Sequence, residues 1–328
     1  MRKKALITGI YGQDGSFLCE QLLGQKYDVV GVVRKNLSKA SLVIKKELDN
    51  KGIKPRLLTV DLLEKEQVAA LFEQEKPDEC YHVAAYHVSS EGRGNGNTIS
   101  EQELFNNNLL MTANILDGIK RMSPNTKIVT AGSCLMYDDS STVMQDEDTP
   151  FCSHSLYGLA KISENMLVKY YRNLGVFVCN AILYNHESHR RTEDFVTKKI
   201  VKNMVDIYKG KITKFSLGNL EAEKDWGYAG DYTVAMQLML KASTPDDYIL
   251  ATGTTHSIRE FVGCCADILN IRDWENKIMI DNNITKRKIK GRLCGNSERA
   301  KKVLGWSHKK DFRKLVENMI ENQMLLDM

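Results

Sequence analysis

The feature that most constrains the fold is a regular alternation of short β-branched segments with helical segments up to residue 131. Short apolar, β-branched segments of this kind are typical of strands that are buried on both faces of a sheet. The predicted strands are residues 4–8, 28–33, 56–60, 79–84 and 126–131, and the predicted helices between them are residues 15–23, 65–74 and 104–121. Repeated strand–helix–strand units pair in parallel with right-handed crossovers. The sequence therefore predicts an α/β fold built on a doubly wound parallel sheet.

The pattern changes at about Asn185. The second half contains predicted helices over residues 195–209, 231–241, 257–269 and 310–328, with a short strand at 214–217. This indicates a nucleotide-binding domain at residues 1–184 and a smaller C-terminal α/β substrate-binding domain at residues 185–328, with interleaved boundaries. In doubly wound folds, ligands bind at the carboxyl ends of the strands.

Composition excludes several classes of protein. The excess of 46 Lys and Arg over 42 Asp and Glu gives a net charge of +4, which is too small for nucleic-acid binding and suits an anionic small molecule. No apolar run approaches the roughly 18 residues that span a bilayer. The eight cysteines contain no CxxC pair, and the seven histidines lack ligand spacing, so buried or free thiols and no metal are expected. A soluble cytoplasmic protein is expected.

A glycine-rich turn follows the first predicted strand and opens the first helix. Its glycines are Gly9, Gly12 and Gly15, with Gln13 and Asp14 between them. Glycines allow a tight turn and let a pyrophosphate approach the N–H groups of the helix N-terminus. The spacing is GxxGxxG rather than GxGxxG, and a tight turn alone would also require glycine. Its place after the first strand favours a Rossmann-type dinucleotide site.

Charges at two strand ends bear on the cofactor. Arg34 and Lys35 follow the second predicted strand, where an NAD site usually has an acid for the ribose hydroxyls. Cations there suit a 2′-phosphate, which favours NADP over NAD, although Lys35 also fits a solvated surface. Asp61 ends the third predicted strand. It could accept a hydrogen bond from the adenine amino group or cap the next helix.

Tyr157 and Lys161 lie four residues apart at the start of a predicted helix, on one helical face. A lysine ammonium beside a phenol favours phenolate, a base that can take a proton from a sugar hydroxyl while hydride leaves for a nicotinamide. Ser133, after a predicted strand, could share the substrate's hydrogen bond. A YxxxK pair alone is common on surface helices. Together with the glycine turn, it predicts an oxidoreductase site.

Longer motifs carry a resemblance to a known family. The chain resembles the extended short-chain dehydrogenase/reductases and, among them, the GDP-mannose 4,6-dehydratase family over nearly its whole length. Besides the glycine turn and the Tyr157–Lys161 pair, the matching segments are residues 185–188, 190–191, 195–200, 217–220, 225–227, Ala300 and 304–306. These segments are far more specific than the dinucleotide and YxxxK motifs.

The resemblance implies a tightly held nicotinamide cofactor and a GDP-linked sugar in the cleft below the C-terminal domain. The implied cofactor-binding residues are Gly9, Gly12, Gln13, Asp14, Gly15, Arg34, Asp61, Leu62, Tyr157, Lys161 and His186. The implied substrate-binding residues are Asn185, Val196, Lys199, Leu217, Gly218 and Lys224.

The first chemical step implied by the family is oxidation at C4 by Tyr157 and Lys161, with Ser133 assisting. Lys199 and Lys224 suit a diphosphate, and solvated surface charge is the alternative interpretation of each. Family members are commonly oligomers, so a homodimer or homotetramer is implied. In such an assembly the loop at residues 34–41 reaches a neighbour's cofactor.

The sequence departs from the family pattern at the elimination step. Leu135 stands where the family carries a glutamate that removes the C5 proton and protonates the departing hydroxyl. General acid–base groups contribute typically about 10²–10⁴-fold, so elimination would need a substitute. Cys134, Asp138 and Glu187 are the candidates. A second departure at residues 286–289 and 293–296 weakens the expected specificity for GDP.

The main expectation is an NAD(P)-dependent enzyme that oxidises C4 of a GDP-linked hexose or heptose and stops at the 4-keto stage, as a 4-dehydrogenase or an epimerase. The alternative is a complete 4,6-dehydratase that gives a 4-keto-6-deoxy sugar. A third hypothesis is a cofactor-holding protein without turnover, although nothing structural requires Ser133, Tyr157 and Lys161 together. The family implies a place in the synthesis of polysaccharide precursors.

Overall fold

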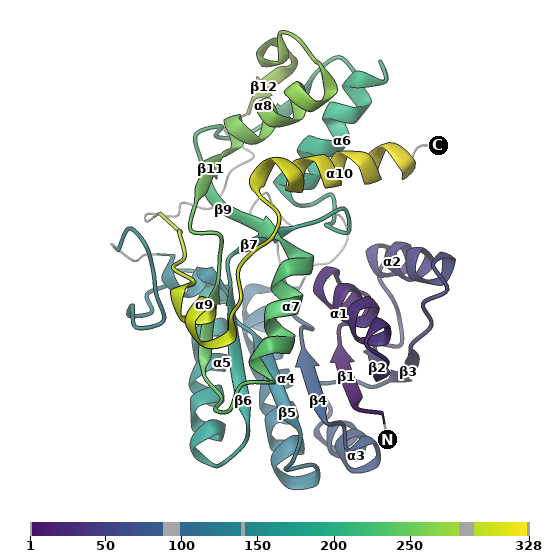
Figure 1. The fold of residues 1–328 in the computed structure, drawn as a ribbon, viewed down its shortest axis with the longest axis vertical. Helices are drawn as coiled ribbons and strands as arrows, with labels where there is room; N and C mark the ends of the chain where they lie inside the picture. The colour runs from purple at the N-terminus through teal and green to yellow at the C-terminus, as the bar shows by residue number, and fades with distance from the viewer. Residues whose placement is uncertain (1, 88–98, 139–141, 282–291, 327–328) are drawn as a thin grey trace.

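A seven-stranded parallel sheet forms the centre of the molecule (Figure 1). The computed structural model describes residues 2–87, 99–138, 142–281 and 292–326. The strand order is β10-β6-β5-β4-β1-β2-β3, and every neighbouring pair is parallel. The strands are β1 (Lys4–Thr8), β2 (Asp28–Val33), β3 (Arg56–Thr59), β4 (Glu79–His82), β5 (Lys127–Ala131), β6 (Val178–Leu183) and β10 (Asp247–Leu250). The predicted doubly wound α/β fold is confirmed.

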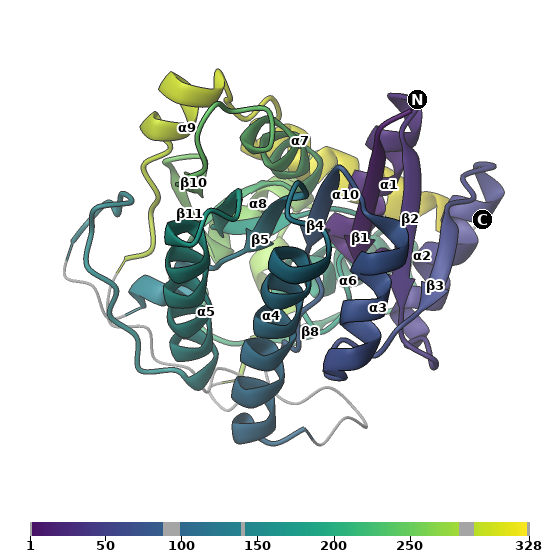
Figure 2. The same ribbon diagram turned by 90° about the horizontal axis from the view of Figure 1, so that it is seen from below.

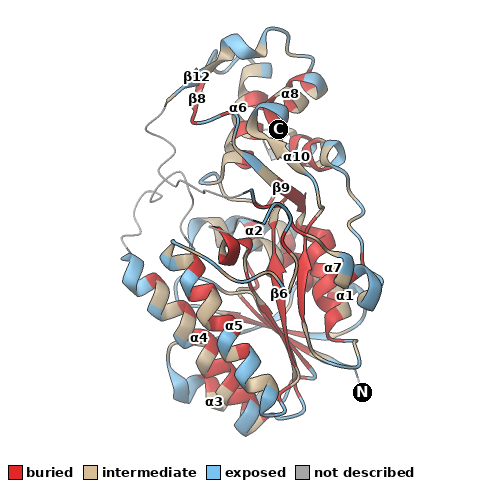
Figure 3. Ribbon diagram, turned by 90° about the vertical axis from the view of Figure 1, so that its left-hand side faces the viewer, coloured by how far each residue is buried: buried red, intermediate tan, exposed pale blue. Residues whose placement is uncertain are grey.

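Helices cover both faces of this sheet (Figure 2). One face carries α1 (Gln13–Gly24), α2 (Lys39–Asn50), α7 (Ala229–Met239) and α9 (Glu298–Leu304), and the other carries α3 (Lys65–Glu75), α4 (Glu101–Met122) and α5 (Leu156–Asn173). The central strands are apolar on both sides, and burial is concentrated along them (Figure 3). Two hydrophobic clusters therefore sandwich the sheet.

The strand order indicates where a ligand-binding crevice forms. β1 pairs with β2 on one side and with β4 on the other, so the direction in which strands are added reverses next to β1. In doubly wound sheets, the carboxyl ends of the strands beside such a reversal form the binding crevice. The glycine turn follows β1 directly, at this point of the fold.

Segments from the two halves of the chain meet in the central sheet and in its hydrophobic core. β10 pairs in parallel with β6, although the chain between them has already visited the C-terminal part. The indole of Trp306 is buried with the α1 and α7 side chains and donates a hydrogen bond to the Asp231 carbonyl at 2.9 Å. A domain division at residue 184 stays a prediction.

In the C-terminal part, two small sheets and the helices α6, α8 and α10 lie above the carboxyl ends of the central strands (Figure 1). One sheet has the order β11-β9-β7 and the other pairs β12 with β8. The elements are β7 (Asn185–Glu187), α6 (Val196–Tyr208), β8 (Phe215–Leu217), β9 (Glu223–Tyr228), β11 (Thr255–Ser257), α8 (Ile258–Leu269), η2 (Trp274–Lys277), β12 (Ile278–Ile280) and α10 (Phe312–Leu326). Apolar faces of α6, α8 and α10 form its core.

Several elements differ from the sequence predictions. α2, β6 and β10 were not predicted, and α2 shortens the predicted loop at residues 34–41 because its helix begins at Lys39. Of the α2 side chains only Ile44 and Leu48 are buried, which gives the helix a weak apolar pattern. In the described part of the chain, no helix is long and apolar enough to cross a membrane. The departure predicted at residues 286–289 lies outside the described residues.

Candidate active site

The glycine turn between β1 and α1 is packed too closely for side chains. Gly9 has φ +68°, and a Cβ there would meet the Ala84 Cα at 2.9 Å. A Cβ on Gly15 would lie 2.2 Å from the Gly9 carbonyl oxygen. Gly12 is the N-cap of α1 and supplies no side-chain cap, so the first N–H groups of the helix have no such partner. This arrangement suits an anionic group at the helix N-terminus.

Replacing Gly15 with alanine tests this packing. The new methyl group would collide with backbone atoms of Gly9 and Ile10, which cannot rotate away. We expect the free energy of unfolding to fall by about 1–3 kcal/mol, as for other overpacked sites, and nicotinamide cofactor binding to weaken. Gly24→Ala, on the same helix with nothing within 4 Å of the new Cβ, should be neutral or stabilising. Equal changes in the free energy of unfolding for the two variants, measured by denaturant unfolding, would contradict the close packing of Gly15.

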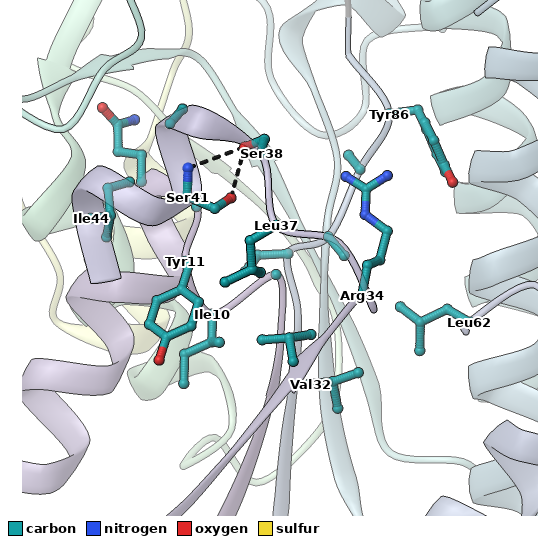
Figure 4. A pocket seen from close by; sticks show the side chains of 18 of the residues that line it. Ile10, Tyr11, Val32, Arg34, Leu37, Ser38, Ser41, Ile44, Leu62 and Tyr86 are labelled. Atoms are coloured by element: carbon teal, nitrogen blue, oxygen red, sulfur yellow. Dashed lines mark hydrogen bonds between the residues drawn. The ribbon is translucent and has the colours of Figure 1, made fainter. Parts of the chain in front are cut away.

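A cavity of about 310 Å³ opens beside this turn (Figure 4). Gly9, Gly12, Gln13, Arg34, Asp61 and Leu62 line it, as do Arg190, Arg191 and Phe195. Six of the predicted cofactor residues are therefore brought together. The other five, Asp14, Gly15, Tyr157, Lys161 and His186, lie outside its lining. The cationic lining residues Arg190 and Arg191 were noted only as motif matches in the sequence.

Arg34 lies at the cavity wall between Tyr86 and Leu62 (Figure 4), with its guanidinium carbon 5.2 Å from the Tyr86 ring centroid. Asp61 accepts a hydrogen bond from the Leu63 N–H at 3.0 Å. The cap of α3 is Glu64 instead, and its side chain makes no capping bond. The Asp61 carboxylate thus caps a turn before the helix and also lines the cavity.

The first turn of α1 is joined to the segment after β7. Gln13 donates to the His186 carbonyl at 3.0 Å and accepts from the Ser188 hydroxyl at 2.8 Å. Asp14 pairs with the His186 ring at 3.1 Å. Burial acts to raise the pKa of Asp14, but the charge and hydrogen bond of His186 outweigh it and hold this pKa below its usual value. Asp14 and His186 therefore hold α1 against β7.

The predicted catalytic residues meet at the start of α5. Tyr157 lies in the first turn of this helix. The Lys161 ammonium donates to the Ala131 carbonyl at 2.9 Å and lies 5.8 Å from the Tyr157 ring centroid. Ser133 precedes the short helix η1 (Cys134–Tyr137), and its hydroxyl accepts from the Leu135 N–H at 3.2 Å. The Lys161–Ala131 bond thus joins the start of α5 to the end of β5, two residues before Ser133.

The Tyr157 phenol ionises less readily than the neighbouring Lys161 led us to expect. Burial raises the pKa of its phenol, and the Lys161 charge opposes this rise without cancelling it. Glu164 and Cys134 add to the rise, while Arg191 acts with Lys161. More positive charge is needed before the phenolate forms readily.

A row of planar groups connects the cavity to Tyr157, and the sequence analysis missed it. The Arg191 guanidinium carbon lies 3.5 Å from the Phe195 ring centroid. His87 stacks on Phe195 at 5.3 Å between centroids and meets the Tyr157 ring edge-to-face at 4.9 Å. His87 follows β4, where no motif marks it. Its role in the site arises from tertiary packing.

The candidates for replacing the glutamate at position 135 are poorly suited to acid–base chemistry. Burial raises the pKa of the Cys134 thiol to about 12. The buried Asp138 carboxylate accepts from the His154 N–H at 3.0 Å. The buried Glu187 carboxylate accepts from the Thr197 hydroxyl at 2.7 Å and pairs with Arg191 at 3.1 Å. These structural contacts argue against each of the three in that role.

The predicted substrate residues fall into two groups. Asn185 accepts a long 4.0 Å contact from the Cys134 thiol, and Lys224 lies close enough to influence the same thiol. Val196 and Lys199 lie in the first turn of α6, which follows the cavity residue Phe195. These four are near the Tyr157 region or the cavity.

The remaining two substrate predictions lie elsewhere. Leu217 is fully buried in the core of the C-terminal part, so its side chain is unavailable to a ligand. Gly218 lines a separate cavity of about 410 Å³ together with Arg259 and Trp274. Within the described residues, no group of His, Cys, Asp or Glu could hold a metal ion.

Solved structures with the same architecture support the class that the fold and site define. The dTDP-glucose 4,6-dehydratase of Bacillus anthracis, solved in complex with NAD, superposes with a TM-score of 0.83 at 17% identity and covers 98% of this chain and 97% of that one. RMD from Pseudomonas aeruginosa, complexed with NADPH, gives 0.79 at 18% identity over 99% of each chain. This chain has the fold of the extended short-chain dehydrogenase/reductases.

Sequence comparison defines the family. Residues 6–319 match the family described as GDP-mannose 4,6 dehydratase. GDP-mannose 4,6 dehydratase 2 of Arabidopsis thaliana is 36% identical over 337 residues, covering 99% of this chain and 88% of that protein. GDP-mannose 4,6 dehydratase of Homo sapiens is 34% identical over 358 residues, covering 97% and 91%. The chain belongs to the GDP-mannose 4,6-dehydratase family.

Proposed function

We propose that this protein is an NAD(P)-dependent GDP-sugar 4,6-dehydratase, which converts a GDP-linked hexose or heptose into a 4-keto-6-deoxy sugar. The observation that carries the proposal is the contact of Lys161 with the Tyr157 ring, which the His87 and Phe195 rings connect to the cavity, in a chain of this family. This favours the alternative of the sequence analysis over its main expectation of a reaction that stops at the keto stage.

The cavity has the properties that a nicotinamide dinucleotide requires. The pyrophosphate of the cofactor would lie at the N-terminus of α1, where glycines leave room and N–H groups lack a side-chain cap. Arg34 lines the cavity just after β2, where a cation favours NADP. The lining residues Arg190 and Arg191 are already paired with Glu20, Glu47 and Glu187. Ser38 and Ser41, at the start of α2, add hydroxyl groups to the same wall. When bound, the oxidised ring supplies a hydride acceptor and positive charge.

Ser133, Tyr157 and Lys161 each have a role in the proposed oxidation at C4. Tyr157, as phenolate, takes the proton from the C4 hydroxyl, and Lys161 stabilises the negative charge on its oxygen. Ser133 holds the C4 oxygen by a hydrogen bond. Positive charge beside Tyr157 offsets the burial that raises its pKa, so the base forms when the cofactor is in place.

The GDP moiety would lie between α6 and β7. Asn185, Val196, Lys199 and Lys224 would contact it. The N-terminus of α6 has no side-chain cap, and its N-cap residue Phe195 lines the cavity. A diphosphate is favoured by such a terminus and by lysine ammonium groups. A homo-oligomer remains part of this proposal, by analogy with the family.

Elimination of water needs an acid–base group that Leu135 cannot supply. We assign this role to His87, whose ring lies against Tyr157. Histidine is the commonest general acid–base residue. Its imidazole would take the C5 proton and deliver a proton to the C6 oxygen, so that water leaves and a C5–C6 double bond forms. The hydride taken from C4 would then return from the reduced cofactor to C6 and a proton would return to C5, so that the 4-keto-6-deoxy product differs from the substrate by one water.

Leu135 favours a second candidate function, oxidation at C4 that stops at the 4-keto sugar. The two functions give products of different mass. Purified protein incubated with GDP-mannose and a GDP-heptose should give a product that has lost one water. A product that has lost only two hydrogens, with reduced cofactor appearing, would replace the dehydratase by a 4-dehydrogenase. No product with either sugar nucleotide would contradict both.

A further inference from the structure

Glu164 lies on the same helix as the proposed catalytic residue Lys161 and contacts its ammonium group. The Glu164 carboxylate oxygen Oε2 lies 3.1 Å from the Lys161 Nζ, and the two side chains are only 7% and 4% exposed. Lys161 also donates to the Ala131 carbonyl. Two of its three ammonium protons therefore have fixed acceptors, one on each side.

A chain of buried hydrogen bonds ends at the same carboxylate oxygen. The Ala84 N–H donates to the Thr8 hydroxyl at 3.2 Å, and this hydroxyl lies 2.8 Å from Nδ1 of His82. Nε2 of His82 lies 3.3 Å from the Thr112 hydroxyl, which donates to Glu164 at 2.9 Å. The chain joins β1, β4, α4 and α5 beneath the proposed active site.

The bond directions follow from the Glu164 end of the chain. Thr112 gives its single proton to Glu164 and therefore accepts from Nε2 of His82. The unprotonated Nδ1 of the neutral His82 ring then accepts the Thr8 proton, which fixes the assigned tautomer. Burial, with the Lys161 charge, lowers the pKa of His82 to about 3, which agrees with a neutral ring. The chain therefore delivers a donor to Glu164, as a carboxylate requires.

We propose that Glu164 is a positioning residue that holds Lys161 in place and keeps it charged, with the His82–Thr112 chain holding Glu164 as the anion. The proposal rests on the proposed role of Lys161 in oxidation at C4. A buried ammonium is costly without a partner charge. Glu164 supplies that charge at a fixed position.

The electrostatics around Lys161 favour its charged form. Burial raises the pKa of Glu164, and the Lys161 charge, its hydrogen bond and the Thr112 hydroxyl oppose this rise. The titratable groups that face it are Glu164 and Tyr157 on α5 and His82 on β4. Burial acts to lower the pKa of Lys161, but the Glu164 charge and hydrogen bond reverse this effect and raise it. Oxygen Oε1 of Glu164 is buried and has no hydrogen-bond partner among the described residues. A purely structural carboxylate would normally have both oxygens satisfied.

The test compares Glu164→Gln with Glu164→Asp and Ser163→Ala. Glutamine keeps the size of the side chain and removes its charge, so the basic limb of the kcat/KM profile should move down by about one pH unit as Lys161 loses its proton more easily. Aspartate keeps the charge and should move it less. Ser163, the preceding residue, only donates to the Leu159 carbonyl, and its alanine variant should leave the profile unchanged.

A second readout needs no substrate. The NMR signals of the lysine side-chain ammonium groups, followed against pH in the holoprotein, report the protonation of each lysine directly. The titration midpoint of Lys161 should lie about one pH unit lower in Glu164→Gln than in the wild type, with the half-exposed Lys169 as internal standard. An unchanged Lys161 midpoint would overturn the proposal even if no GDP-sugar is turned over. An inactive wild type with the expected shift would instead contradict the proposed function alone.

Thr112→Val tests the buried chain. Loss of this hydroxyl removes one donor from Glu164 and should lower kcat about threefold to tenfold in the wild-type background, with little further loss in Glu164→Gln. Residues that act through one another are non-additive in this way. Fully additive losses would separate Thr112 from Glu164 and overturn that part of the proposal.

Discussion

Replacing Tyr157 with phenylalanine is expected to lower turnover of a GDP-linked sugar by about 10²–10⁴-fold, because it removes the base for the C4 hydroxyl. Phenylalanine keeps the ring that meets His87 edge-to-face, so the packing at the start of α5 should survive. The loss should appear in kcat, while nicotinamide binding and the free energy of unfolding stay near wild-type values. Single-turnover measurement of C4 oxidation separates this effect from product release.

The matched control is Tyr170→Phe on the same helix. Tyr170 is exposed and contacts Tyr171 rather than the site, so its hydroxyl should be dispensable. A Tyr157→Phe variant that retained turnover within about threefold of the wild type would remove Tyr157 from the chemistry. If no turnover is found and Tyr157→Phe leaves the protein's biological activity intact, the hypothesis of a cofactor-holding protein without turnover is restored.

The second large effect concerns His87 and Leu135. His87→Gln should lower water loss by about 10²–10⁴-fold and leave oxidation at C4 measurable, since the glutamine amide cannot exchange a proton with C5 and C6. The 4-keto sugar with its C6 hydroxyl should then accumulate. Adding Leu135→Glu to His87→Gln should restore water loss, because a carboxylate returns at the position where the family carries one. Product masses follow both steps in one assay.

The control for this experiment is His154→Gln, an exposed histidine near Asp138 that should have no effect on the product. Water loss that is unchanged in His87→Gln would exclude His87 as the acid–base group. If the wild type itself loses no water and Leu135→Glu alone creates that activity, the 4-dehydrogenase replaces the dehydratase as the function.

The fold was predictable where the sequence of a single segment is enough to indicate its structure. β1 and the glycine turn could be located because a buried strand followed by spaced glycines is found in few local structures other than a strand–turn–helix unit. α2 was missed since its exposed Leu42 and Val43 obscure the helical pattern, and only Ile44 and Leu48 are buried. Short strands such as β10 depend on tertiary pairing, here with β6, for their stability.

The site was predictable to the extent that its residues belong to motifs. Tyr157 and Lys161 share one helical face, and the structure places Lys161 beside the Tyr157 ring. Glu164 lies three residues after Lys161, so helical spacing alone could have indicated this contact. His87 could not be found this way, because its contact with Tyr157 joins the segment after β4 to α5.

The late position of β10 in the chain affects how the protein is made. β6 lacks one neighbour until residues 247–250 have been synthesised, and the face of α1 that packs on α7 stays uncovered until residues 229–239 follow. During translation the nascent sheet therefore exposes a strand edge and apolar surface, which are sites of aggregation. A fragment that ends at residue 184 would keep both exposed. Expression of the cofactor-binding half alone should therefore yield insoluble protein.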